Sequence, residues 1–127
     1  MAQDLQERTK QFALRVIRLV ESLPDTHVAR RIGDQLLRAG MSVGANYRAA
    51  CRGRSPAEFR AKLGIVVEEG DETIYWMELL VEGGFIIEAR IRDLMSEAHE
   101  IVAMTVASIK TSTRKSDPAK SNRSGNP

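Results

Sequence analysis

The chain has 127 residues, of which 43% are hydrophobic and 28% charged, and its formal net charge is +2. This length suits one domain with a real core, and the composition is unlike that of a disordered protein. The single cysteine, Cys51, excludes an intramolecular disulfide and a cysteine zinc site, and no apolar run approaches the ~20 residues that span a bilayer.

The amino terminus is polar and lacks the apolar segment of a signal peptide, so we expect a soluble, cytoplasmic protein with no membrane partner. From there on the sequence has helical periodicity, and no segment alternates like a strand. The first helix is predicted over residues 4–22 and ends before Pro24, because proline disfavours helical geometry in the residue before it. Asp25 or Thr26 then caps a second helix that we expect to reach about Arg52.

The run Ser55-Pro56-Ala57-Glu58 is the sharpest boundary in the sequence, since it combines an N-cap serine, a first-turn proline and a capping-box glutamate. The third helix begins there and ends at Gly83-Gly84, where glycine tolerates the left-handed conformation that closes a helix. A fourth helix is predicted from about Ile87 to Thr113. Residues 114–127 hold no large apolar side chain and are expected to form a disordered basic tail.

Four amphipathic helices with short connections predict an all-α fold, an antiparallel up-down-up-down four-helix bundle over residues 1–113. Glycines refine this prediction. Gly70 falls on the core face of the third helix, where it permits close helix approach. Gly40 and Gly44 lie away from the expected core stripe of the second helix, so they either admit a neighbouring subunit or are simply tolerated at the surface. That core stripe is Val28, Ile32, Leu36, Ala39, Val43 and Ala50.

Beside the core stripe of the second helix runs a polar stripe, Gln35, Arg38, Ser42 and Asn46, whose spacing places all four on one face. An unpaired buried donor costs about 1–3 kcal/mol, so this stripe should meet another helix of the chain or a second copy of it. We expect Asn46→Leu or Arg38→Ala to perturb assembly or to lower stability by about 1–3 kcal/mol.

Apolar residues of the third helix, Trp76, Leu79 and Leu80, fall outside its predicted core stripe. Exposed apolar patches of this kind are typical of an interface. Together with the polar stripe they predict helix packing and a homo-oligomeric subunit interface through Gln35, Arg38, Ser42, Asn46, Trp76 and Leu80.

Charge is strongly segregated along the chain. Residues 30–62 carry eight Lys/Arg against Asp34 and Glu58, which gives +6, whereas residues 63–113 carry ten Asp/Glu against three basic residues, which gives −7. Such segregation indicates basic and acidic elements that face each other within the fold or across copies, or else solvated faces.

A basic cluster straddles the junction of the second and third helices. Converging arginines at a helix corner suit the phosphate backbone of RNA or DNA, and the scarcity of aromatic residues there argues against base reading. Nucleic-acid binding is therefore the alternative function, through Arg48, Arg52, Arg54, Arg60 and Lys62.

Catalytic signatures are absent from the sequence. Neither His27 nor His99 belongs to the Glu-x-x-His pair of di-iron bundles, and there is no phosphate-binding glycine loop or serine nucleophile elbow. The acidic run at residues 68–72 spreads over more than half of the helix circumference, and Glu68, Asp71, Glu78 and Glu82 with Tyr75 instead form an outward stripe. We expect no catalytic residue, no metal and no cofactor.

The stretch from Gln35 to Ser55, QLLRAGMSVGANYRAACRGRS, resembles the bacterial four-helix-bundle family of rRNA intervening-sequence proteins. The match extends through residues 58–59, 62–69 and 72–80 and takes in short pieces near the start, so it covers nearly all of residues 5–110. The resemblance implies a homopentamer with no known catalytic activity. It also implies a link to the accessory variability proteins of diversity-generating retroelements, basic pentamers that partner a reverse transcriptase and bind nucleic acid.

Two departures from the family pattern bear on function. Ala39 and Ala49 stand where the family usually has serine and glutamate, so we do not expect here any ion pair that this glutamate makes with a neighbouring helix in the family. The acidic stripe of the third helix makes this chain less basic than the retroelement branch. The first functional hypothesis is thus a non-enzymatic, ring-forming assembly module, and RNA, DNA or another protein remains as an alternative partner.

Overall fold

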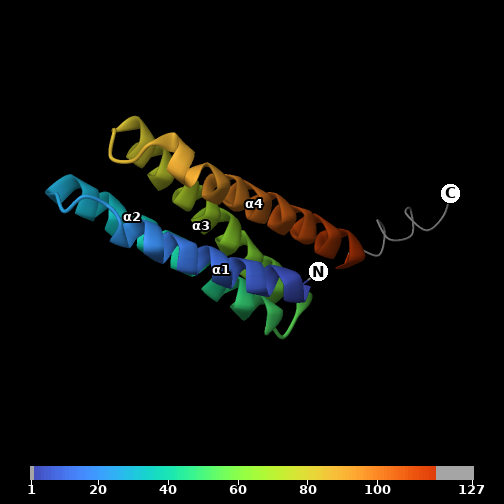
Figure 1. The fold of residues 1–127 in the computed structure, drawn as a ribbon. Coiled ribbons are helices and arrows are strands. Elements are labelled where there is room, and N and C mark those ends of the chain that lie inside the picture. The colour runs from blue at the N-terminus through green and yellow to red at the C-terminus, as the bar shows by residue number, and fades with distance from the viewer. Residues whose placement is uncertain (1, 117–127) are drawn as a thin grey trace.

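A computed structural model describes the backbone of residues 2–116 and the side chains of residues 5–116. Within that range all regular structure is helical, and the predicted all-α four-helix bundle is confirmed. Figure 1 shows the helices in chain order, α1 (Ala2–Glu21), α2 (His27–Cys51), α3 (Pro56–Glu82) and α4 (Glu88–Ser116).

The helix boundaries follow from the local chemistry that the sequence predicted. Thr26 Oγ1 accepts a hydrogen bond from the backbone N–H of Ala29 at 3.2 Å and so caps α2. Ser55 Oγ accepts from the backbone N–H of Glu58 at 3.1 Å and caps α3, while the Glu58 carboxylate accepts from the backbone N–H of Arg54 at 3.2 Å.

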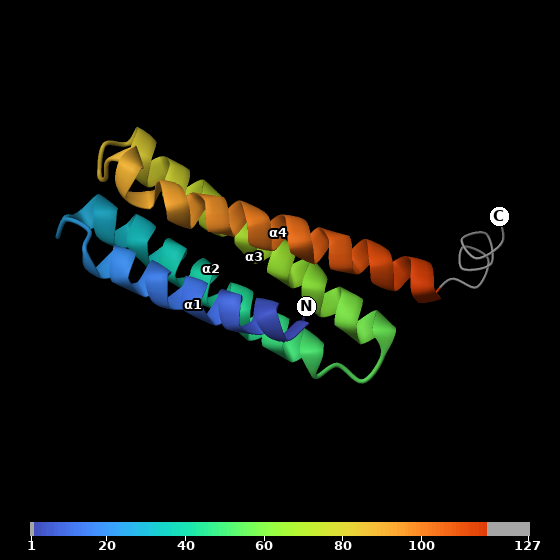
Figure 2. The ribbon, with the colours of Figure 1, turned by 45° about the vertical axis from the view of Figure 1, so that its right-hand side comes forward.

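Consecutive helices run in opposite directions, and the chain enters α1 at the end of the bundle where α4 finishes (Figures 1 and 2). In each hairpin, residues near the start of one helix contact residues near the end of the next, as antiparallel helices require. In the first hairpin Gly44 faces Thr9 while Gly33 faces Leu23, and in the second Arg60 reaches Ser112. α2 and α3 share the most extensive contact, and α1 meets α4 least closely.

The core is apolar and draws on all four helices. The predicted stripe of α2 is confirmed at Leu36, Ala39, Val43 and Ala50, but the prediction for Val28 is wrong, because this first-turn side chain is 51% exposed. The largest fully buried side chains are Phe12, Leu36, Leu63, Met77, Leu80, Ile91 and Ile101.

The core also corrects the placement of Leu80, which was predicted to lie outside it and is completely buried. Leu80 follows Met77 by three residues and Thr73 by seven, and both of these are buried, so all three occupy one face of α3. Leu80 therefore contributes to helix packing within the chain and to no outer surface.

Glycines set the distance between helices within each hairpin. A Cβ on Gly40 would lie 2.8 Å from Val16 Cγ1, and one on Gly44 would lie 3.1 Å from the carbonyl oxygen of Thr9. Both glycines therefore line the α1–α2 contact, which corrects the alternatives of a subunit contact or an open surface. On α3 the prediction for Gly70 is confirmed, since a Cβ there would lie 2.5 Å from Val102 Cγ2.

The last helix is longer than predicted. The sequence placed the start of a disordered tail at residue 114, yet α4 continues to Ser116. Arg60 fixes this last turn, because its Nη1 donates to Ser112 Oγ at 3.2 Å and to Ser116 Oγ at 2.9 Å. Basic residues in the last turn also favour the helix, since they oppose its dipole. The remainder of the predicted tail, residues 117–127, lies outside the described residues.

Candidate functional site

The polar stripe of α2 reaches another helix through Arg38. Its Nη2 lies 2.7 Å from Glu72 Oε1 and its Nη1 lies 3.3 Å from Glu69 Oε1, both on α3. Ser42 Oγ instead donates to the backbone carbonyl of Arg38 at 2.8 Å, and Asn46 Nδ2 donates to that of Ser42 at 2.9 Å. Of the stripe, Arg38 therefore supports α2–α3 packing, whereas the hydroxyl of Ser42 and the amide of Asn46 form their hydrogen bonds within α2.

Gln35 continues the stripe towards the start of α2 and is exposed. Trp76 lies one turn beyond Glu72 on α3 and is half-buried against the core. Its indole Nε1 is buried and finds no acceptor among the described residues. The neighbouring Tyr75 meets it edge-on with ring centroids 5.1 Å apart and is itself 53% exposed, so Tyr75 is the large aromatic side chain that α3 presents to solvent.

The predicted basic cluster separates into different environments. Arg60 is half-buried and bound to α4, where it also donates to the carbonyl oxygen of Ser112 at 3.4 Å. Arg54 is exposed at the α2–α3 turn, and Lys62 is half-buried on α3. Arg48 and Arg52 stay together on the outer face of α2 and line a groove.

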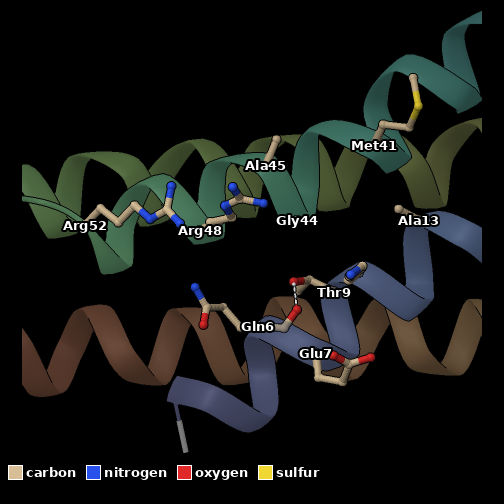
Figure 3. Close-up of a pocket in the computed structure, with 10 residues that line it drawn as sticks. Gln6, Glu7, Thr9, Ala13, Met41, Gly44, Ala45, Arg48 and Arg52 are labelled. Atoms are coloured by element: carbon tan, nitrogen blue, oxygen red, sulfur yellow. Dashed lines mark hydrogen bonds between the residues drawn. The ribbon is translucent and has the colours of Figure 1, made fainter.

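This groove runs between α1 and α2 and encloses about 830 Å³ (Figure 3). From α2 come Met41, Gly44, Ala45, Arg48 and Arg52. From α1 come Gln6, Glu7, Thr9, Lys10 and Ala13. Figure 3 shows the two arginines along the α2 wall and Gln6 and Thr9 on the α1 side, with the Thr9 hydroxyl donating to the Gln6 carbonyl at 3.1 Å.

The groove is basic and its cations are free. It holds Lys10, Arg48 and Arg52 against the single carboxylate of Glu7. Among the residues that the structure describes, none of these three cations forms a salt bridge. Glu7 instead accepts a hydrogen bond from Gln11 Nε2 at 2.9 Å. The site can thus receive an anionic group without breaking an existing ion pair.

An acidic surface lies on the outer side of α3. We define the acidic face as Glu68, Asp71, Tyr75, Glu78 and Glu82, all of them exposed. Within residues 5–116 its four carboxylates form no salt bridge, in contrast to the neighbouring Glu69 and Glu72, which bind Arg38. The outward acidic stripe that the sequence predicted is therefore present and unpaired.

The other perturbed groups are structural. Arg8 Nη2 lies 2.6 Å from Glu97 Oε1 and 3.0 Å from Glu100 Oε1, and the hydrogen bond to Glu97 chiefly raises the pKa of its guanidinium. Burial raises the pKa of Tyr47 to about 12, and the nearby Cys51 adds to the effect. Neither the Arg8 guanidinium nor the Tyr47 hydroxyl lies in a pair of side chains that could act as nucleophile and base. Among the described residues there is no cluster of three His, Cys, Asp or Glu that could hold a metal, and no helix long and apolar enough to cross a membrane.

Sequence reasoning missed the α1 side of the groove. The signal was present as spacing, because Gln6, Lys10 and Ala13 recur at three- and four-residue intervals and so share one face of α1. On α2 the same rule places Met41, Ala45, Arg48 and Arg52 on one face. What the sequence did not supply was the α1–α2 register that joins the two faces.

Comparisons with known proteins place this geometry in a family. A family model described as 23S rRNA-intervening sequence protein matches residues 2–107. A crystal structure of a protein of unknown function from the S23 ribosomal protein family of Bacteroides thetaiotaomicron has 31% sequence identity and a TM-score of 0.81, over 86% of this chain and 97% of that chain. A search of curated proteins found no match. The match over residues 2–107 confirms the resemblance, and the chain belongs to the 23S rRNA-intervening sequence protein family.

Proposed function

We propose that this protein is a non-enzymatic assembly module that works as a homo-oligomer. The observation that carries the proposal is charge left unpaired inside one chain. Residues 30–62 carry +6 and residues 63–113 carry −7, yet Arg38 is the one residue among those described whose side chain links the two segments by salt bridges. Further charges in both segments form no salt bridge among the described residues and are available to a second copy: Arg31, Arg48, Arg52, Arg54 and Lys62 in the first, and Glu68, Asp71, Glu78, Glu82 and Asp93 in the second.

Opposite charge on separate surfaces favours association of identical chains, because it steers encounter and fixes orientation. When the two contacting surfaces differ, the association is head-to-tail and closes into a ring if the rotation allows. The family resemblance favours a ring of five subunits. Exposed apolar side chains within the charged surfaces, Met41 at 43% and Tyr75 at 53%, add the desolvated contacts that a stable interface needs.

Native mass spectrometry and light scattering at low and high salt test this proposal. We expect a mass that is a multiple of the 14.1 kDa subunit, five subunits for the family's ring, and a shift towards smaller species as salt rises. A 14.1 kDa monomer at tens of micromolar protein in low salt overturns it.

Nucleic-acid binding is the second candidate function. It is favoured by the cations of Arg48, Arg52, Arg54 and Lys62, which form no salt bridge within residues 5–116 and lie near the α2–α3 turn, where α4 also ends with basic residues in its last turn. Such cations bind phosphates and release counterions, so affinity falls steeply with salt. The test is fluorescence anisotropy of a labelled, structured RNA at low and physiological salt, and absence of binding at low salt overturns this candidate.

A further inference from the structure

We infer that the groove between α1 and α2 of one subunit is the docking site for the acidic face of α3 on a second copy of this chain. The inference rests on the proposed homo-oligomer and names the two surfaces that build it. Its basis is the match between the two surfaces in charge, length and shape.

The two surfaces carry opposite charges, and these charged groups form no salt bridge among the described residues. The groove presents the cations of Lys10, Arg48 and Arg52, and the acidic face presents four carboxylates. In the described part of the chain none of these seven groups has a salt-bridge partner, so docking would form ion pairs without breaking others. Complementary potentials of this kind set specificity and orientation at interfaces.

The two surfaces are also matched in length. The α2 wall of the groove extends from Met41 to Arg52, which is about 16 Å at a helical rise of 1.5 Å per residue. By the same measure the acidic face extends about 21 Å from Glu68 to Glu82, and its part from Glu68 to Glu78, about 15 Å long, matches the α2 wall. The acidic face is a stripe along one helix and the groove follows two neighbouring helices, so α3 of a second copy can lie along the groove.

The shape of the groove suits a helix with one large side chain. Small residues, Ala13, Gly44 and Ala45, line it where the α1 and α2 backbones come close. Small side chains allow a third helix to approach. Tyr75 projects from the middle of the acidic face and can bury its ring over Ala45, near the middle of the α2 wall, which supplies the kind of aromatic anchor found at interface centres.

One copy cannot fill its own groove. The acidic face points away from the core on α3, and α3 is not a neighbour of α1 in the bundle (Figure 2). The contact is therefore between unlike surfaces of different copies, the head-to-tail arrangement that generates rings. A nucleic acid backbone fits the groove less well, because the exposed thioether of Met41 on its wall suits an apolar side chain and not a phosphate.

The test is reciprocal charge reversal in the full-length protein. The groove variant carries Arg48→Glu and Arg52→Glu, and the face variant carries Asp71→Lys and Glu78→Lys. We expect each variant alone to raise the subunit dissociation constant by about 100-fold, because like charges then oppose each other across the interface. The chain that carries all four substitutions should assemble again to the wild-type mass, since its reversed groove accepts the reversed face of the next copy.

The matched control reverses exposed charges outside both surfaces, Arg18→Glu with Asp93→Lys, and should keep the wild-type mass. Assembly of the chain with all four substitutions also shows that these substitutions are compatible with folding. If the wild-type protein is a monomer, the proposed function fails. If the wild type is oligomeric and both variants keep its mass, the docking inference fails and the oligomer stands. Loss of RNA binding at unchanged mass in the groove variant likewise overturns the inference and makes the groove a nucleic-acid site.

Discussion

Besides the apolar core that all four helices share, the bundle has two kinds of helix contact, and they divide by position in the chain. Within the hairpins, α1 meets α2 and α3 meets α4 at glycines, where Gly40 faces Val16 and Gly70 faces Val102. Between the hairpins, arginines bind pairs of glutamates, Arg38 with Glu69 and Glu72 on α3, and Arg8 with Glu97 and Glu100 on α4.

The difference lies in how much freedom each contact leaves. At a glycine contact an added methyl group has no space, because a Cβ would overlap a branched side chain of the facing helix. At an arginine–glutamate contact long side chains reach over the surface and remain partly hydrated. We therefore expect substitutions at the glycine contacts to change stability more than substitutions at the ion pairs, which mainly fix the register between helices. Substitutions at both kinds of contact test this ranking.

The largest effect is expected for Gly40→Val. Its Cβ would lie 2.8 Å and 2.9 Å from the two γ-carbons of Val16 and 3.1 Å from Val16 Cβ, so no rotation of that side chain relieves the clash. Overpacking of this kind should lower the free energy of unfolding by about 3 kcal/mol. Urea denaturation followed by circular dichroism measures the change. An unchanged midpoint would show that α1 and α2 move apart to accept the valine without a loss of stability.

Smaller changes in stability are expected for two glycine-to-alanine substitutions on α3, one a loss and the other a gain. Gly70→Ala should lower stability by about 1 kcal/mol, because the clash with Val102 outweighs the gain in helix propensity. Gly64→Ala should raise stability by about 0.5–1 kcal/mol, because a Cβ there meets nothing within 4 Å and the propensity gain remains. The pair shares one helix and one chemical change. Equal shifts for both variants in thermal and urea unfolding would contradict the glycine contact at residue 70.

The Arg8 cluster should contribute less than Gly40 and about as much as Gly70. The side chains of Arg8 and Glu97 are 25% and 20% exposed, so their pairing is stronger than that of a surface ion pair but still hydrated. A double-mutant cycle with Arg8→Met and Glu97→Gln should give a coupling energy of about 1 kcal/mol that weakens at high salt. A coupling of zero would mean that α1 and α4 are held by apolar contacts alone.

The fold could be predicted from the sequence because its signals are local. The Ser55-Pro56 start of α3 and the Thr26 cap of α2 act within one helical turn, and the apolar periodicity of each helix predicted most of the core. Errors arose where tertiary packing decides. Leu80 was misplaced because its face of α3 is broad, and α4 was predicted too short because Arg60 comes from a distant part of the chain.

The candidate site was predicted only in part for the same reason. Arg48 and Arg52 form a recognisable basic pair in the sequence, and the outward acidic stripe follows from helical spacing alone. The groove itself depends on the α1–α2 register, which Gly40 and Gly44 determine through contacts with Val16 and Thr9. Sequence spacing places these glycines on a face of α2, but it does not say which helix covers that face.

The smallest effect is expected at the polar stripe, for which the sequence alone predicted a loss of about 1–3 kcal/mol. Arg38 is 49% exposed, so Arg38→Ala should lower the free energy of unfolding by less than about 1 kcal/mol, and Arg38→Lys by less than that. Asn46→Leu should be nearly neutral, because Asn46 donates only within α2. If Arg38→Ala instead changes the oligomer mass without changing unfolding of the subunit, the charge that it leaves on Glu69 and Glu72 acts between copies. In that case glycine contacts would stabilise the subunit, and charged side chains would stabilise the contacts between subunits.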